Sequence, residues 1–164
     1  MILSGKQLKE QQIITNIENP KCVQQVGIDL EIIKIDSVED RGFIFKDKTV
    51  LPKYYEIKTN FRVGGGAGWM LKPGYYQIWF KQGCKIPSNI MFRLRQRSSL
   101  LRSGIQIHSS VFDPGFETDQ MGTFMIVHRE TWVQQGARVC QAYADETTTI
   151  LEDDLYKGQY QKDQ

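Results

Sequence analysis

The 164-residue sequence predicts an all-β protein, a distorted β-barrel or jelly roll with a short N-terminal helix. Its apolar residues fall in many short runs rich in β-branched and aromatic side chains, and Gly, Pro, Asn or Asp separates one run from the next. Short strands divided by turn residues are typical of β-sandwiches and barrels. Strands and helices do not alternate, which argues against a parallel α/β sheet.

The predicted elements follow in chain order. Ser4 and Gln7 have the spacing of a capping box, which predicts a helix over residues 4–12. The predicted strands include GFIF, YYEIKT, YYQIWF, IMFRLR, GIQIHS, TFMIV and RVCQAYA. The glycine-rich segment 62–69 lacks the Lys-Ser/Thr pair of a nucleotide P-loop, so we interpret it as a flexible hairpin loop.

Length and composition limit the classes of function. The length fits one domain over residues 1–164, and we expect 147–164 to form a C-terminal tail. A net charge of +2 is too small to indicate nucleic-acid binding. The chain has neither a signal peptide pattern nor an apolar run that could span a bilayer, so we expect a cytoplasmic protein without a membrane partner. Three isolated cysteines, Cys22, Cys84 and Cys140, predict reduced core thiols.

A basic cluster surrounds the hydroxyls of Ser98 and Ser99. On a strand, Arg93, Arg95 and Arg97 would fall on one face, because side chains alternate. Guanidinium and hydroxyl groups are donors for phosphate oxygens, and a helical turn in SSLLR would add backbone amides. These residues alone favour a phosphate site and a solvated basic edge strand about equally.

Two carboxylates stand in unusual places. Asp113 lies between an apolar pair and a Pro-Gly turn, where it would either orient a water as a general base or, as is commoner, cap the turn. Asp29 lies in an apolar run and needs a cation or donor as partner, or a place near Mg²⁺. Gln141 is weak evidence when taken singly. The pattern His128-x-Glu130 matches half of a zinc deaminase signature, and we interpret it as chance because the cysteine half is missing.

The order and spacing of these motifs resemble the dCTP deaminase/dUTPase superfamily, in its deaminase-like branch. MILSGKQL resembles the start of that branch, and VGIDLEI resembles the first dUTPase motif. The block that ends in RSSLLRSGI, the hairpin VFDPGFE and the segment QQGARVCQ resemble the later motifs. The resemblance implies a dUTPase-like β-clip that assembles as a homotrimer with intersubunit active sites, and a deoxynucleoside triphosphate substrate with Mg²⁺.

The resemblance implies a dUTP diphosphatase, in which Asp113 activates the water that attacks dUTP. Asp29 would orient the water shell of the metal or a neighbouring arginine. The residues implied to bind the phosphates are Arg97, Ser98, Ser99, Arg102 and Gln141, with Tyr156, Lys157 and Gln159 of the tail closing the site. Those implied to bind the base and sugar are Ser109, Val111, Phe112 and Phe116.

Two alternatives remain at this point. Family deaminases have Thr-Leu-Glu in the strand after the hairpin, whereas this chain has Thr123-Phe124-Met125, and methionine cannot transfer a proton. A dCTP deaminase, or a bifunctional dCTP deaminase/dUTPase, would need Glu117 to fold back over the base as a substitute. The other alternative is a regulator that binds deoxynucleotides without turnover.

Overall fold

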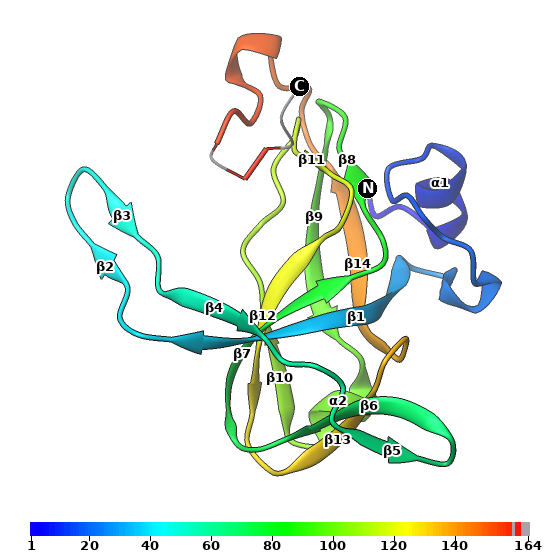
Figure 1. Cartoon of the computed structure of the whole chain (residues 1–164). Helices are drawn as coiled ribbons and strands as arrows, with labels where there is room; N and C mark the ends of the chain where they lie inside the picture. Colours follow the sequence, from blue (N-terminus) through cyan, green and yellow to red (C-terminus); the bar gives the residue numbers. More distant parts are fainter. Residues whose placement is uncertain (159, 162–164) are drawn as a thin grey trace.

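The computed structural model describes residues 1–158, 160 and 161, and the predicted all-β class is confirmed (Figure 1). The predicted N-terminal helix is α1 (Gly5–Glu10), and its capping box is present. Ser4 accepts a hydrogen bond from the backbone N–H of Gln7, and the Gln7 side chain accepts one from the N–H of Ser4. The other helical elements are η1 (Pro20–Cys22), α2 (Ser98–Arg102) and η2 (Glu152–Asp154).

The main sheet is antiparallel and has the order β10-β12-β7-β1-β14-β9, with β4 paired to the far end of β1. The two outer strands, β9 and β10, lie next to each other, so the sheet is nearly closed into a barrel (Figure 1). The strands of this sheet are β1 (Ile28–Glu39), β4 (Lys53–Glu56), β7 (Gly74–Phe80), β9 (Ile90–Gln96), β10 (Ile105–His108), β12 (Gly122–Val127) and β14 (Arg138–Glu146).

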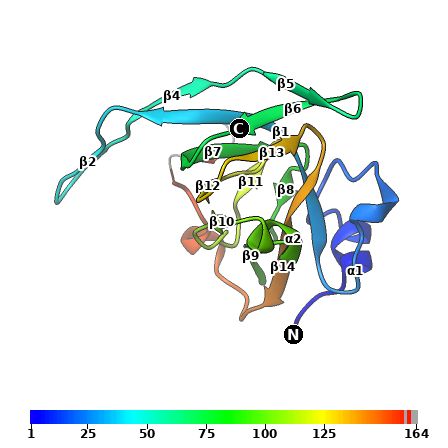
Figure 2. The ribbon, with the colours of Figure 1, turned by 90° about the horizontal axis from the view of Figure 1, so that it is seen from below.

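Smaller sheets extend the barrel, and Figure 2 shows β4, β5 and β6 as a layer across it. The predicted glycine-rich hairpin is confirmed: Gly64 and Gly65, at φ +56° and +83°, turn the chain between β5 and β6. The remaining strands are β2 (Phe43–Ile44), β3 (Thr49–Val50), β5 (Phe61–Val63), β6 (Gly66–Leu71), β8 (Cys84–Lys85), β11 (Glu117–Thr118) and β13 (Thr131–Gln134).

Strand β1 pairs with three different strands along its length. Its first residues pair with β14, its middle with β7 and its last residues with β4. The pairing shifts register between Leu30 and Glu31 and again between Ile32 and Lys34, as at β-bulges, which bend a strand. As a result, Asp29 lies next to β14, whereas Asp36 lies between β4 and β7.

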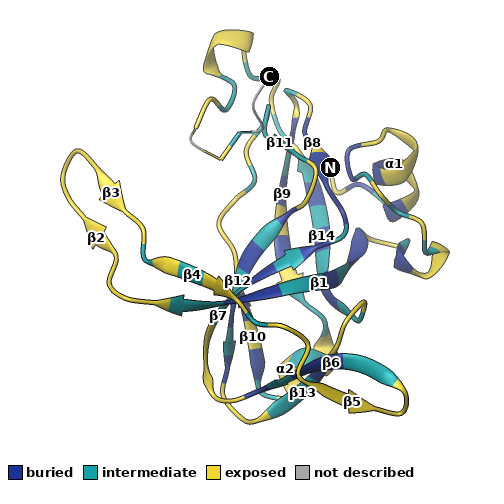
Figure 3. Cartoon of the chain, in the orientation of Figure 1, coloured by how far each residue is buried: buried dark blue, intermediate teal, exposed yellow. Residues whose placement is uncertain are grey.

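The core fills the barrel, whereas residues 40–52, which we call the arm, are mostly exposed (Figure 3). The prediction of reduced core thiols is confirmed, because Cys22, Cys84 and Cys140 are free and buried. Burial raises the pKa of Cys22 to about 11 and that of Cys84 to about 12, so both thiols stay protonated at neutral pH. The described part of the chain has no helix that is long and apolar enough to cross a membrane.

Candidate functional site

A cavity of about 640 Å³ lies between the hairpin that follows β10, the strands β7 and β12, and the C-terminal tail. Aromatic side chains from all of these segments line it. Asp113 also lines the cavity, and it is the only acidic side chain to do so among the described residues. An apolar cleft that holds a single carboxylate is typical of a ligand site with one catalytic or orienting group.

The hairpin fixes the position of Asp113 through its backbone. Phe112 exchanges two backbone hydrogen bonds with Phe92 of β9, at 2.9 and 3.1 Å. Pro114 and Gly115 then turn the chain, with Gly115 at φ +87° as the third residue of a type II turn requires. The turn closes through a 3.1 Å bond from the N–H of Phe116 to the carbonyl oxygen of Asp113.

The carboxylate of Asp113 does not cap this turn. The side chain is exposed, and no group in the described part of the chain forms a hydrogen bond or ion pair with its carboxylate oxygens. The turn is instead held by backbone contacts, including a 3.0 Å bond from the N–H of Gly115 to the carbonyl oxygen of Ile86. The carboxylate is therefore available to accept a proton from a water in the cavity.

Of the four hairpin residues predicted to bind base and sugar, three lie at this cavity. Phe112 stacks on Phe92 with ring centroids 4.6 Å apart, and Phe116 meets the edge of Phe112 at 5.7 Å. Val111 also lines the cavity, whereas Ser109 lines a neighbouring cavity of about 360 Å³ that includes Arg93 and Arg95 among its lining residues. The strands β7 and β12 also contribute lining residues to the main cavity, and no sequence motif marks them.

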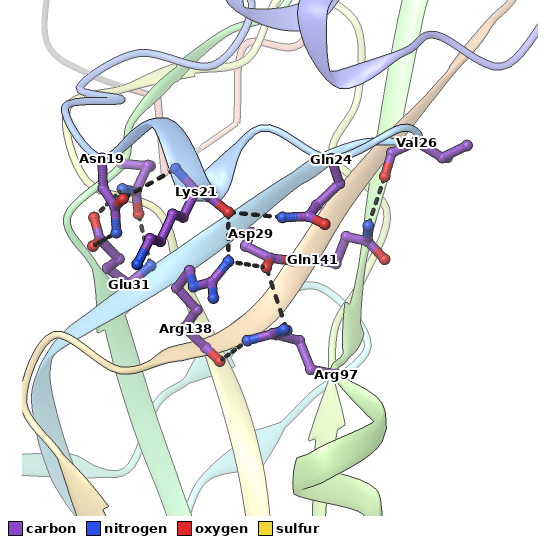
Figure 4. A network of polar contacts seen from close by, with 10 residues as sticks. Asn19, Lys21, Gln24, Val26, Asp29, Glu31, Arg97, Arg138 and Gln141 are labelled. Carbon is purple, nitrogen blue, oxygen red and sulfur yellow. Dashed lines mark hydrogen bonds and ion pairs between the residues drawn. The ribbon is translucent and has the colours of Figure 1, made fainter.

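A second polar centre, which we call the ionic cluster, consists of Asp29, Arg97 and Arg138 (Figure 4). Oδ2 of Asp29 lies 3.3 Å from Nε of Arg97 and 3.2 Å from Nη1 of Arg138. Asp29 is only 2% exposed. Burial raises the pKa of its carboxyl, although the two guanidinium groups act in the opposite direction.

The ionic cluster provides the partner that a carboxylate in an apolar run requires. Arg97 also donates a 3.3 Å hydrogen bond to the carbonyl oxygen of Arg138, and Arg138 donates one to that of Lys21. The structure thus favours the arginine-orienting role of Asp29, and its water-mediated metal role stays a prediction. Arg138 was not singled out in the sequence, although it belongs to the motif QQGARVCQ.

The residues predicted to bind phosphates gather around the ionic cluster. Gln141 is the register partner of Asp29 on β14, and its amide donates a 2.6 Å hydrogen bond to the carbonyl oxygen of Val26 (Figure 4). The predicted helical turn is α2, which starts directly after Arg97. The exposed residues of α2 include Ser98, Ser99 and Arg102. None of these phosphate-binding candidates lines the Asp113 cavity of the same chain.

The tail packs on the hairpin of its own chain. The N–H of Tyr156 donates a 3.0 Å bond to the carbonyl oxygen of Pro114, and its ring meets the edge of Phe116 at 5.3 Å. The amide of Gln161, which sequence analysis missed, bridges the carbonyl oxygen of Gly115 and the N–H of Glu117 at 3.0 and 3.1 Å.

Of the tail residues predicted to close the site, Tyr156 lines the cavity. Lys157 is exposed and donates a hydrogen bond to the carbonyl oxygen of Asp153 within the tail. The third predicted residue, Gln159, lies outside the described residues.

The two positions relevant to deamination do not face the cavity. Met125 is 1% exposed and lies in the core, while its neighbours Gly122 and Phe124 on β12 line the cavity. Glu117 forms an ion pair with Lys85 at 3.4 Å and is not a lining residue. The described residues therefore offer no second carboxylate for proton transfer to a bound base.

The sequence model of the dCTP deaminase-like family matches residues 2–145. The "Probable deoxyuridine 5'-triphosphate nucleotidohydrolase" of Aeropyrum pernix is 29% identical over 162 residues, which cover 98% of each chain. The "Deoxyuridine 5'-triphosphate nucleotidohydrolase" of Methanocaldococcus jannaschii is 33% identical, over 87% of this chain and 91% of the relative. The "dCTP deaminase, dUMP-forming" of Methanobrevibacter smithii is 26% identical, over 92% and 83%.

The crystal structure of 2'-deoxycytidine 5'-triphosphate deaminase from Agrobacterium tumefaciens has the same fold. It matches with a TM-score of 0.60 at 15% sequence identity, over 87% of this chain, and the chain spans 47% of that structure's length. The family match covers most of the sequence, from the helix α1 to the last residues of β14. The chain belongs to the dCTP deaminase-like family.

Proposed function

We propose that this protein is a dUTP diphosphatase, which hydrolyses dUTP to dUMP and pyrophosphate. The observation that carries the proposal is the carboxylate of Asp113, which lines an aromatic cavity without a second acidic group among the described residues. One carboxylate suffices to activate a water, whereas deamination also needs a group that moves protons at the base. The names of the archaeal relatives support the same reaction.

In the proposed mechanism, Asp113 accepts a proton from the attacking water. The oxygen of that water forms a bond to the α-phosphorus, and the bond from this phosphorus to the bridging oxygen of the pyrophosphate breaks. The Pro-Gly turn and the two hydrogen bonds to Phe92 hold the hairpin in one conformation. The backbone of Asp113, the general base, is therefore already in place before the reaction begins. Rigid placement of a general base contributes to rate because the geometry is set before the proton moves.

The relatives support a metal-dependent nucleotide hydrolase, and we propose Mg²⁺ as the metal. The described residues contain no cluster of three or more His, Cys, Asp or Glu that would hold an ion by themselves. This fits Mg²⁺, which keeps several waters and takes much of its coordination from substrate phosphates. When bound, Mg²⁺ would neutralise charge on the triphosphate and on the leaving pyrophosphate.

For the phosphates we propose Arg97, Ser98, Ser99, Arg102 and Gln141, supplied by a neighbouring subunit of a homotrimer. Two facts support an intersubunit site. These residues do not line the Asp113 cavity of their own chain, and a cyclic oligomer brings different surfaces of one chain together. Asp29 would position Arg97 and Arg138 for this task through the ion pairs of the ionic cluster.

The test is hydrolysis of dUTP and dCTP by the purified protein with Mg²⁺, with products separated by nucleotide chromatography. We expect dUMP and pyrophosphate from dUTP and no change in dCTP. Asp113→Asn should lower kcat by about 10²- to 10⁴-fold and still bind Mg²⁺ and dUTP, because only the base is lost. Glu117→Gln, on the same hairpin but outside the cavity, is the matched control and should keep its activity.

Other outcomes would replace the proposal. Normal dUTP hydrolysis by the Asp113→Asn variant would refute the role of this carboxylate. Conversion of dCTP that is lost in the Glu117→Gln variant would mean that the chain is a deaminase. Binding of either nucleotide without turnover would mean that the protein is a non-catalytic deoxynucleotide-binding regulator.

A further inference from the structure

Trp79 on β7 lines the Asp113 cavity, and none of the predicted motifs accounts for it. Its indole N–H donates a 2.7 Å hydrogen bond to Oδ2 of Asp36, a carboxylate that is only 3% exposed. The ammonium group of Lys34 lies 3.2 Å from Oδ1 of Asp36 and 5.4 Å from the centroid of the indole ring. A buried carboxylate thus fixes one edge of the ring, and its charge is balanced by a lysine.

The neighbouring strand β12 packs against the indole ring of Trp79. Gly122 of β12 is the register partner of Trp79, and a Cβ at this position would lie only 3.0 and 3.1 Å from atoms of the six-membered ring. A larger residue at position 122 would therefore push the indole away from the sheet. The glycine, the Asp36 hydrogen bond and the lysine together hold the ring in one orientation before any ligand arrives.

The face of Trp79 differs from those of most other aromatic residues in the cavity. Phe112, Phe116 and Tyr156 pack against one another, and Phe124 stacks on Tyr75 with centroids 5.2 Å apart. Tyr54 also packs on Phe124, at 6.3 Å. Among the described residues, only two lining aromatics lack a ring neighbour: Trp79, and Tyr160 in the tail, which is 58% exposed.

We propose that Trp79 is the platform on which the nucleobase of the substrate stacks, with Asp36 as the residue that positions the indole. This inference rests on the proposed nucleotide substrate and adds a binding residue for its base. The indole N–H is already used by Asp36, so the ring offers no donor, and a stacked base would share the ring face with the ammonium group of Lys34, which lies 5.4 Å from the centroid.

Stacking of this kind adds affinity without contributing to the chemical step. The base lies far from the bond that breaks at the α-phosphorus, so its contact with Trp79 is the same in the ground state and in the transition state. Such uniform binding changes KM and leaves kcat nearly unchanged. Loss of one base–aromatic stack weakens binding by about 5- to 100-fold.

The experiment uses the intrinsic fluorescence of the full chain during titration with dUMP, which is not hydrolysed, alongside steady-state kinetics with dUTP. The chain has three tryptophans, and the other two lie outside the cavity. Trp132→Phe is the matched control, because it changes an aromatic residue of β13 whose indole N–H is buried without a partner in the described residues. The test variants are Trp79→Phe, Trp79→Leu, Asp36→Asn and Asp36→Ala.

We expect dUMP to quench the fluorescence of the wild type and of Trp132→Phe, and the quench to disappear in Trp79→Phe. Trp79→Leu should raise KM for dUTP by about 5- to 100-fold with kcat within about twofold, and Trp79→Phe should restore part of the affinity. Asp36→Asn keeps an acceptor for the indole N–H and should bind nearly as the wild type does, whereas Asp36→Ala should resemble Trp79→Leu.

Different results overturn different claims. Wild-type affinity in Trp79→Leu, checked for its fold by circular dichroism, would refute the platform and leave the diphosphatase intact. A quench that depends on Trp79, without any hydrolysis of dUTP, would refute the diphosphatase and leave the platform intact. Retention of the quench in Trp79→Phe would also refute the platform, because the signal would then come from another tryptophan.

Discussion

The Asp113 cavity and the ionic cluster are built in opposite ways. The cavity is apolar and open, and its one carboxylate has no partner among the described residues. In the cluster, Asp29 is 2% exposed and two arginines share one of its oxygens. The cavity has the properties of a site that receives a planar base and one water, and the cluster has those of a support that holds cations in place for an anion.

Within one chain, neither region contains all the groups that a nucleotide site needs. The cavity of one chain contains no arginine or lysine among its described lining residues, although a triphosphate needs several cationic groups. The surroundings of the cluster offer arginines and hydroxyls without a free general base, because Asp29 is buried and paired with two arginines. In the proposed homotrimer, a site between two subunits would combine the carboxylate of the cavity with the cationic groups around the cluster.

The most direct test of a shared site is to damage the two regions in different chains. Asp113→Asn damages only the cavity, and Arg102→Ala damages only the phosphate side. Each variant alone should be strongly impaired, and the oligomer refolded from a mixture of both should regain activity. The gain is the largest effect predicted here, because some sites then receive an intact Asp113 from one chain and an intact Arg102 from another.

The measurement is dUTP hydrolysis after denaturation and refolding of the two variants together and separately. Two portions of one variant, refolded with each other, control for activity gained by refolding itself. If the mixture stays as inactive as its components while the size of the oligomer is normal, the two regions do not form a shared site between subunits. The proposal of an intersubunit site would then be wrong.

The next largest effect is expected on stability, when the carboxylate at the centre of the ionic cluster is removed. Asp29→Ala leaves the guanidinium groups of Arg97 and Arg138 without their shared partner, and we expect the free energy of unfolding to fall by about 3 kcal/mol. Both arginines keep some contact with water, which limits the loss. Urea denaturation followed by circular dichroism measures it, and a fall below about 0.5 kcal/mol would show that the ion pairs are not a stabilising support.

Two glycines, one in the hairpin that lines the cavity and one outside it, allow a test with a smaller expected effect. Gly115 in the hairpin and Gly136 before β14 have similar positive φ values, +87° and +81°. An added Cβ meets nothing within 4 Å at Gly136, whereas at Gly115 it lies 2.8 Å from Cβ of Leu155 and 3.1 Å from the backbone nitrogen of Tyr156. Alanine at either position should cost about 1–2 kcal/mol of stability through backbone strain.

Only Gly115→Ala should also displace the tail from the cavity. We expect KM for dUTP to rise about fivefold, the equivalent of about 1 kcal/mol, while Gly136→Ala keeps the wild-type KM. Steady-state kinetics at matched fractions of folded protein separate the two effects. Equal KM values in both variants would mean that the docked tail plays no part in substrate binding.

Local signals predicted a large part of the fold. The capping box at Ser4, the hairpin at Gly64 and Gly65 and the turn at Pro114 each depend on neighbouring residues, and all are present. The alternation in residues 105–108 likewise gives two buried and two exposed positions. Such features are predictable because a few residues decide them without help from the rest of the chain.

The parts that could not be predicted depend on pairings between distant segments. Arg138 reaches Asp29 only because β14 pairs with β1 in one register, and Gln161 meets the hairpin through a tail that shows no periodic pattern. The indole of Trp79 is fixed by Asp36, which is 43 positions away. The sequence alone also left open which face of β12 carries Met125, because a shift of one residue reverses every side chain of a strand.

The pairing partners of β1 also determine when this strand can pair during synthesis of the chain. Ribosomes make proteins from the N-terminus, so residues 28–31 emerge long before residues 138–142, with which they form their ladder. During that interval an apolar edge of β1 has no partner, and such edges promote association between nascent chains. The barrel therefore closes only after residues 138–142 have been made.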